Sequence, residues 1–453
     1  MVKRALAFAV LALTACTPAP SDAPPSRAET MAEVLPPMRM FSTAPDLAPT
    51  RSNTDMARDF LDLAFQMESG RSVPRLTRFE APISVRVTGS PPPSLVADLR
   101  ILLGRLQAEA GIDIFLTGAP EAAITIEAIP RAELNRAVPR AACFVVPRIS
   151  TWEEFKQVRR TPQVDWTTLE RRDRAAIFVP ADVSPQEIRD CLHEELAQAL
   201  GPLNDLYRLP DSVFNDDNIH AVLTGFDMLV LRAYYDPALQ NGMSRGDVAA
   251  RLPRILAQLN PGGERGGPLP LNDTSRDWVD QIELALAGSA APAERRRAAE
   301  TAINLGRAFG WSGPRQGFAL YAYGRLQVSN NPDIALQAFL EAERIYVAQP
   351  ETTLHAAHVA VQLAAFALSS GDAVAVLRLT EAAIPIARTH ENAALLATLL
   401  MFRSEALSIQ GDTAGAEAAR LDSLGWARYG FGSERNVWAR AREIAALSPL
   451  SEG

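Results

Sequence analysis

The chain has 453 residues, of which 47% are hydrophobic and 22% charged, with a net charge of −8. That length is more than one hydrophobic core usually serves, so we expect two or three domains. The acidic balance and the lack of any block of Lys or Arg argue against a nucleic-acid-binding surface. Beyond the first residues, no stretch is long and apolar enough to span a membrane.

The N-terminus has the pattern of an export signal. Lys3 and Arg4 precede an apolar run, residues 5–13, which is too short to cross a bilayer as a stable helix. The run ends in LTAC at Cys16, which resembles the lipobox of bacterial lipoproteins. The resemblance implies a lipid on Cys16 and a membrane anchor in the cell envelope. It favours the outer membrane, facing the periplasm, because the Asp that often signals inner-membrane retention is replaced by Thr17. An ordinary secretory signal with a chance Cys is the alternative.

Residues 17–52 are rich in Pro, Ser and Ala and lack apolar periodicity, which predicts a disordered tether. Two further cysteines, Cys143 and Cys191, follow in the chain. An oxidising envelope favours a disulfide between them, and such a bond would contribute roughly 4 kcal/mol. Two buried free thiols are the alternative.

The next 200 residues alternate between predicted strands and helices. Apolar spacing predicts a helix from Asn53 that stops at Gly70 and an amphipathic helix over Pro93–Ala110. Short β-branched or apolar runs predict five strands, with the sequences ISVRVTG, IDIFL, AITIEAI, CFVV and AAIFVP. This order predicts an α+β domain over residues 53–260, with a small sheet backed by helices.

A further helix carries the most distinctive motif. Ser184 has the pattern of its N-cap and Gly201 that of its stop. The motif, CLHEELAQALGPLND, begins at Cys191. Read from His193, it fails the zinc-binding HExxH pattern because the second position is Ala197. Read one residue later, it has the HExxHxxGxxH spacing of the metzincins, with both histidines of the pair replaced.

The shifted motif resembles a degenerate metzincin site. The resemblance implies metal-ligand positions at Glu194, Gln198 and either Asn204 or Asp205, and a general-base position at Glu195. Amide oxygens bind Zn²⁺ poorly and suit a hard cation such as Ca²⁺, so no cofactor is certain and a divalent Ca²⁺ or Zn²⁺ is possible. Capping and pairing on a helix face is the structural alternative for these residues.

Residues 53–253 are also similar to an uncharacterised bacterial family, the domain of unknown function 2927. The similarity rests on an EExxQxLGxxND signature at Glu194, on SVFNDD at Ser212 and on LTGFD at Leu223. It implies a zincin-like fold and supplies no activity. His193 falls outside every ligand position, whereas His220 follows the second motif and is expected either to approach the site or to be structural.

Glycines and prolines in residues 261–275 predict a linker to an all-α domain over residues 276–453. Similar helical segments begin at Asp333, Asp372 and Asp412, at intervals that resemble tetratricopeptide repeats with longer helices. The last segment, Asn436–Leu447, is predicted to cap the stack. An irregular helical bundle is the alternative.

Two functions follow from this organisation. The first is a lipid-anchored binding or scaffold protein whose repeats hold an envelope protein or peptide. The second is an envelope hydrolase that uses Glu195 with a non-standard metal site. The histidines His355 and His358, three residues apart on one helix, are near enough to share a metal, although packed or solvated histidines are the simpler interpretation.

Overall fold

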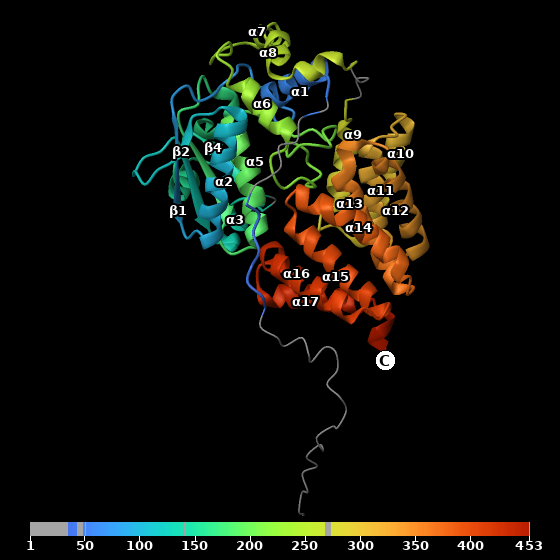
Figure 1. Cartoon of the computed structure of the whole chain (residues 1–453). Helices are drawn as coiled ribbons and strands as arrows, with labels where there is room; N and C mark the ends of the chain where they lie inside the picture. Colours follow the sequence, from blue (N-terminus) through green and yellow to red (C-terminus); the bar gives the residue numbers. More distant parts are fainter. Residues whose placement is uncertain (1–34, 43–48, 50, 140, 268–272, 453) are drawn as a thin grey trace, which may run out of the picture. The chain divides into compact units, whose positions relative to one another are not determined.

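The computed structural model describes residues 35–42, 49, 51–139, 141–267 and 273–452 (Figure 1). The predicted signal peptide with Cys16, the first half of the predicted tether and residues 268–272 of the predicted linker lie outside this part of the chain. Within the described residues, no helix has the length and apolarity needed to cross a membrane.

The first half of the chain contains a mixed five-stranded sheet in the order β2-β1-β3-β5-β4. Strands β2, β1, β3 and β5 are parallel, and β4 pairs with β5 in the antiparallel direction at one edge. The strands are β1 (Ile83–Gly89), β2 (Ile114–Leu116), β3 (Ile124–Ile129), β4 (Phe144–Pro147) and β5 (Ala175–Pro180). Each coincides with one of the five predicted strands, so the predicted small sheet is confirmed.

Eight helices of this half accompany the sheet. They are α1 (Asn53–Phe65), α2 (Pro93–Ala110), α3 (Arg131–Ala137), α4 (Trp152–Val158), α5 (Pro185–Leu200), α6 (Gly225–Tyr234), α7 (Arg245–Ala249) and α8 (Leu252–Leu259). Figure 1 shows α2 and α5 along one side of the sheet, and their apolar residues join the strands in one core. The prediction for α2 is confirmed residue for residue, whereas α1 ends at Phe65, five residues before the predicted stop. There the chain turns back through Gly70, and Gln66 bridges Ser72.

A disulfide joins Cys143 to Cys191, as predicted from their even number and from the compartment. Cys143 immediately precedes β4, and Cys191 lies in the middle of α5. The bond therefore ties the antiparallel edge strand of the sheet to the helix that carries the motif.

The second half of the described chain is helical. Its helices are α9 (Arg276–Leu286), α10 (Pro292–Ala308), α11 (Pro314–Gln327), α12 (Pro332–Val347), α13 (Thr353–Ser369), α14 (Ala373–Thr389), α15 (Ala393–Ile409), α16 (Thr413–Phe431) and α17 (Glu434–Ala445). Consecutive helices pack as neighbours, most extensively α11 with α12, α13 with α14 and α15 with α16. Asp372 and Asp412 are the N-caps of α14 and α16, as their positions in the repeat predict. In the first repeat the N-cap is Asn331, two residues before the predicted start at Asp333, because Pro332 occupies the first helical position.

The predicted disordered tether is wrong for residues 35–42. Residues 35–42 lie against α16, where the Arg39 backbone N–H donates to the Gly425 carbonyl at 3.0 Å and the Phe41 ring stacks on Trp426 at 4.5 Å. Leu35 is buried. The apolar side chains in this Pro-rich segment were too few to predict packing, but α16 supplies an aromatic surface that they cover.

Candidate functional site

The motif helix α5 follows β5 directly and is fixed at both ends. At its start, the Ser184 hydroxyl accepts from the Glu187 backbone N–H, as the predicted N-cap requires. At its end, the buried guanidinium of Arg172 donates to the Gln198 and Ala199 carbonyls at 2.6 and 2.7 Å, and also to the Gly201 carbonyl. A cation on these otherwise unpaired carbonyls stabilises the negative end of the helix dipole.

Arg172 was missed by the sequence analysis, because it precedes β5 by three residues and has no spacing that links it to the motif. Gly201 was assigned to a turn. The structure gives a different reason for it, since a Cβ at this position would lie 2.9 Å from the Tyr234 ring of α6. Gly201 therefore permits the close approach of α6 to the end of the motif helix, and its φ of −169° needs no glycine.

The motif and the SVFNDD segment after it supply a cluster of acidic side chains, here called the carboxyl cluster: Glu194, Glu195, Asp205 and Asp216. Burial raises the pKa of every member, most strongly for Glu195 and Asp205, whose pKa values lie well above their usual range. The pKa of Glu194 is raised to about 7 and that of Asp216 to about 6. Repulsion from neighbouring carboxyl groups raises these values further.

Glu195 is the most buried member of the carboxyl cluster, with 4% of its surface exposed. Its Oε2 atom has no hydrogen-bond partner, and the backbone of Val145 on β4 is the group that lowers its pKa. Burial therefore favours the protonated form of this carboxyl. A protonated carboxyl does not accept a proton from water, so the burial of Glu195 works against the predicted role of general base.

The other predicted ligand positions lie in different surroundings. The Asn204 side-chain amide donates to the Asp62 carbonyl at 3.1 Å, which attaches it to the end of α1. Gln198 lies partly exposed on the last turns of α5. Among the residues that the structure describes, no three His, Cys, Asp or Glu side chains are arranged to hold one metal ion.

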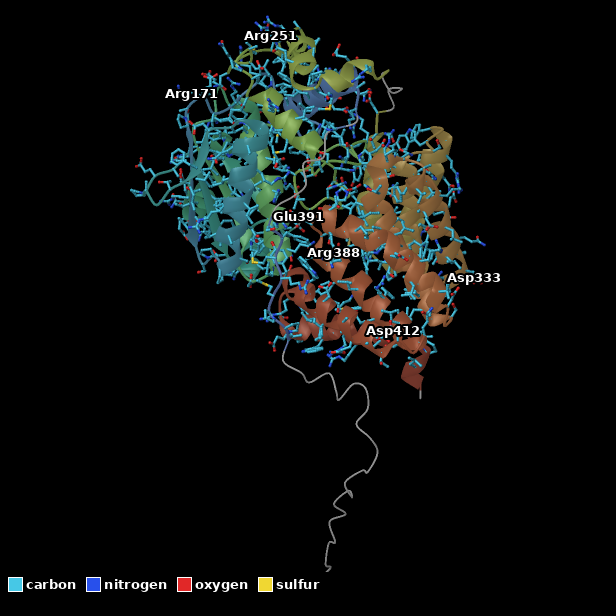
Figure 2. All side chains as sticks on the ribbon, viewed as in Figure 1. Arg171, Arg251, Asp333, Arg388, Glu391 and Asp412 are labelled. Atoms are coloured by element: carbon cyan, nitrogen blue, oxygen red, sulfur yellow. A yellow bond between two sulfur atoms is a disulfide. The ribbon has the colours of Figure 1, made fainter. Side chains whose placement is uncertain are left out.

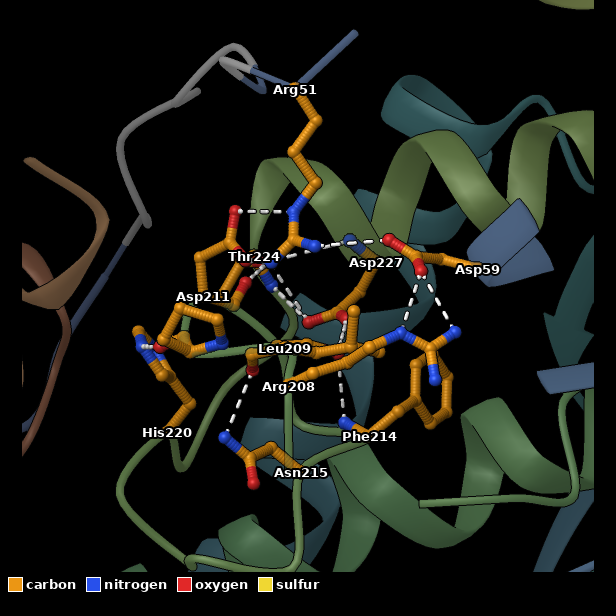
Figure 3. Close-up of polar contacts among 12 residues, drawn as sticks. Arg51, Asp59, Arg208, Leu209, Asp211, Phe214, Asn215, His220, Thr224 and Asp227 are labelled. Carbon is orange, nitrogen blue, oxygen red and sulfur yellow. Dashed lines mark hydrogen bonds and ion pairs between the residues drawn. The ribbon is translucent and has the colours of Figure 1, made fainter. Parts of the chain in front are cut away.

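The two downstream motifs meet at one buried carboxylate. Asp227 on α6 accepts from the Ser212 hydroxyl, from the Val213 backbone N–H at 3.1 Å and from the Thr224 backbone N–H at 2.8 Å (Figure 3). Thr224 caps α6 in return. These contacts close the loop between α5 and α6, so Ser212 and Asp227 have a structural role.

A charged network holds the same loop to α1. Asp59 is fully buried and accepts from Arg51 at 3.0 Å and from Arg208 at 2.9 Å (Figure 3). Arg51 also pairs with Asp211. The negative charge of Asp59 is therefore compensated twice, in contrast to the carboxyl cluster nearby.

The histidines fall in different places. His193 is buried, and its Nδ1 accepts from the Leu223 backbone N–H at 3.0 Å, which makes it a structural neighbour of the motif, as predicted. His220 is buried, and its Nε2 atom lies 2.9 Å from the Pro210 carbonyl. Its ring lies 6.0 Å from that of His355 and 5.2 Å from that of His390.

The first half of α5 packs against the helical region. Arg189 forms a buried ion pair with Glu391. Glu391, labelled in Figure 2, lies in the turn between α14 and α15. Gln186 donates to the Asn392 side chain at 3.1 Å and accepts from the Ala394 backbone N–H at 2.8 Å. Nearby, the Tyr429 hydroxyl of α16 donates to Asp98 of α2 at 2.8 Å.

The helical region also borders the carboxyl cluster. Tyr207, whose hydroxyl donates to Asp216 at 2.9 Å, contacts the rings of Trp278 on α9 and Phe318 on α11. In Figure 1 the loop that carries Tyr207 passes between α5 and α9. Both halves of the described chain therefore contribute side chains next to the carboxyl cluster.

Comparison with known proteins finds one family model that matches part of the chain, residues 53–254. They match the model of a family entered as a protein of unknown function, DUF2927. This agrees with the similarity inferred from the EExxQxLGxxND, SVFNDD and LTGFD motifs. No curated protein matches the chain.

Proposed function

Because residues 53–254 belong to a family of unknown function, DUF2927, we propose a function on physical grounds: a lipid-anchored binding or scaffold protein of the bacterial cell envelope. In this proposal the family domain is a degenerate zincin-like fold. The helical region is a tetratricopeptide-like array that is attached to it and holds a protein or peptide partner. The lipid on Cys16 anchors both at the outer membrane, facing the periplasm.

The observation that carries the proposal is the burial of Glu195 in a motif that lacks both imidazole ligands. The zincin route to hydrolysis needs a carboxylate base beside a metal-bound water. Here the carboxyl is buried, its pKa lies well above the usual range, and the positions of the two imidazole ligands hold Glu194 and Gln198. Burial and the neighbouring carboxyl groups favour the protonated form of Glu195, so these residues support a retained shape more than a retained reaction.

The helical region offers a place for a partner. A cavity of about 380 Å³ lies between α10, α11 and α12. Its lining includes the guanidinium groups of Arg307 and Arg344, the Trp311 ring and one carboxylate, Glu341. Two cations, an aromatic surface and a single anion suit a peptide segment that presents a carboxylate beside an apolar side chain.

A hydrolase remains the second candidate, and one observation favours it. The pKa of Glu194 is about 7, so this carboxyl exchanges protons at the pH of the envelope, as a general acid or base must. In that case Ca²⁺ or Zn²⁺ held near Glu194 and Asp205 would lower the pKa of Glu195 and restore it as a base.

One panel of variants separates these functions. A strain that lacks the chain is complemented with wild type, Glu195→Gln, Arg344→Glu or Cys16→Ala, and the purified wild type and Glu195→Gln chains are incubated with a random peptide library plus Ca²⁺ or Zn²⁺. We expect Glu195→Gln to complement fully and neither chain to cleave peptides. Arg344→Glu should fail at normal abundance, and Cys16→Ala should leave the membrane fraction. Peptide products from the wild type that Glu195→Gln does not release would replace the binding function with the hydrolase.

A further inference from the structure

Four of the five histidines of the chain gather where the family domain meets the repeat helices. His220 comes from the loop between α5 and α6, His355 and His358 from α13, and His390 from the end of α14. The ring centroids of His220 and His390 are 5.2 Å apart, and those of His220 and His355 are 6.0 Å apart. Segments 135 or more residues apart in the sequence thus bring imidazoles to one place.

The hydrogen bonds of two of these rings fix where their lone pairs are. His220 Nε2 lies 2.9 Å from the Pro210 carbonyl, which can only accept, so Nε2 carries the proton and Nδ1 carries the lone pair. His355 Nε2 lies 2.8 Å from Asp217 Oδ2, and its Nδ1 is buried without a partner. Because Asp217 is a carboxylate acceptor, the same assignment follows for His355.

This is the arrangement that supports metal-binding imidazoles in proteins. A ligating histidine donates its second ring N–H to a carboxylate or a backbone carbonyl, which fixes the tautomer and makes the free nitrogen more basic. His355 has the carboxylate form of this support and His220 the carbonyl form. The Nε2 atom of His358 is also buried without a hydrogen-bond partner.

The spacing of the rings matches a shared ion. Two imidazoles on one tetrahedral Zn²⁺, with Zn–N bonds of about 2 Å, have ring centroids about 5 Å apart. The separation of 5.2 Å between His220 and His390 agrees with this value, and His355 is slightly farther away. Burial lowers the pKa of His390 to about 4, so this ring is neutral and able to bind a metal at pH 7.

We propose that His220, His355 and His390 form a binding site for a transition-metal ion of the Zn²⁺ class, supported by Asp217 and Pro210. In the conformation of the described residues, no three His, Cys, Asp or Glu side chains are placed to hold one metal ion. Binding therefore requires the imidazoles to turn toward the ion, and His390, the partly exposed member at a helix end, is the freest to do so. The ion would link the family domain to α13 and α14.

The test uses the processed full chain in detergent, stripped with EDTA and titrated with Zn²⁺ by calorimetry at pH 7.5. We expect one Zn²⁺ per chain with micromolar or tighter affinity and a higher unfolding temperature. His390→Ala should weaken binding at least tenfold, and Asp217→Asn roughly tenfold, as is typical of outer-shell partners. His193→Gln, which alters the one histidine outside the cluster, should bind Zn²⁺ as the wild type does.

Two controls exclude misfolding of the variant and binding of Zn²⁺ at the carboxyl cluster. Metal-free His390→Ala must unfold within a few degrees of the wild type, and Asp217→Asn provides an independent result if it does not. Glu194→Gln should leave Zn²⁺ affinity unchanged. Absence of stoichiometric Zn²⁺ binding, binding that the His390→Ala and Asp217→Asn changes leave intact, or binding lost only in Glu194→Gln would overturn the proposal.

Discussion

Helix α5 carries buried charged side chains in two opposite surroundings. In its first half, Arg189 is paired with Glu391 across the boundary to the repeat helices, and Gln186 satisfies two groups of the α14–α15 turn. In its second half, burial raises the pKa values of Glu194 and Glu195, and repulsion from neighbouring carboxyl groups raises them further. The Arg189–Glu391 pair is electrostatically compensated and the Glu194–Glu195 pair is not, although Arg189, Glu194 and Glu195 lie on the same helix.

This difference indicates a structural role for the Arg189–Glu391 pair and a functional role for Glu194 and Glu195. A buried, paired charge holds two parts of a fold in register, whereas clustered carboxyls destabilise a fold and are retained where a ligand or a reaction needs them. The first half of α5 therefore serves as the attachment point of the helical region. The second half is where a cation, or a cationic group of a partner, would contribute most to stability.

The largest effect is expected from breaking the compensated half. Arg189→Ala leaves Glu391, which is 1% exposed, as a buried charge without its partner. Loss of one member of a buried pair costs about 3 to 5 kcal/mol. We expect the free energy of unfolding, measured by urea denaturation with tryptophan fluorescence at pH 7, to fall by that amount.

The matched control replaces both charges. Arg189→Met combined with Glu391→Leu removes the unpaired charge along with the pair, so most of the loss should be recovered. If Arg189→Ala alone costs less than about 1 kcal/mol, water reaches Glu391 and the first half of α5 is not compensated by this pair.

Much of this architecture could be predicted from the sequence because it is encoded locally. The strand runs, the limits of α2 and the Ser184 cap follow from periodicity and capping chemistry, and the disulfide follows from an even cysteine count in an oxidising compartment. The EExxQxLGxxND motif also located the carboxyl cluster at Glu194, Glu195 and Asp205.

What could not be predicted depends on contacts between distant segments. Arg189 and Glu391 are 202 residues apart, and His220 meets His355 and His390 only because the helical region docks on the family domain. Arg172 has no local pattern that marks it as a helix cap. The contact between the Asn204 amide and the Asp62 carbonyl of another helix could not be predicted for a related reason.

A smaller effect of opposite sign is expected from the uncompensated half. The folded state raises the pKa of Glu194 from 4.5 to about 7, so between these pH values the folded chain holds a proton that the unfolded chain has released. Its stability therefore falls as the pH rises from 4.5 to 7, and the penalty is complete above pH 7. Glu194→Gln removes this penalty. We expect a gain of about 1 to 2 kcal/mol at pH 8, below the roughly 3 kcal/mol of the full shift because the side chain is partly exposed, and no gain at pH 4.

Glu187 on the same helix is the matched control for this change. It lies in the first turn of α5 and pairs with Arg131 at 2.6 Å. Glu187→Gln should lower stability slightly at pH 8, because it removes a favourable charge near the positive end of the helix. A gain for Glu187→Gln equal to that for Glu194→Gln would show that net charge, and not the carboxyl cluster, controls the pH dependence.

The smallest effect is expected from an exposed ion pair, and it tests whether burial makes the Arg189–Glu391 pair stronger than a surface pair. Arg39 pairs with Asp422 of α16 at 2.7 Å, but the Arg39 side chain is 51% exposed and Asp422 keeps a second partner, Arg388, at 2.9 Å. An exposed pair of this kind contributes about 0 to 1 kcal/mol. Arg39→Ala should therefore change the unfolding free energy by less than about 1 kcal/mol, and that small loss should vanish in 1 M salt, which screens exposed charges. The loss from Arg189→Ala should persist at the same salt concentration, since the buried pair is screened far less. Equal salt sensitivity for the two variants would mean that the Arg189–Glu391 pair is as solvated as the surface pair, and the contrast between the halves of α5 would then have to rest on the carboxyl cluster alone.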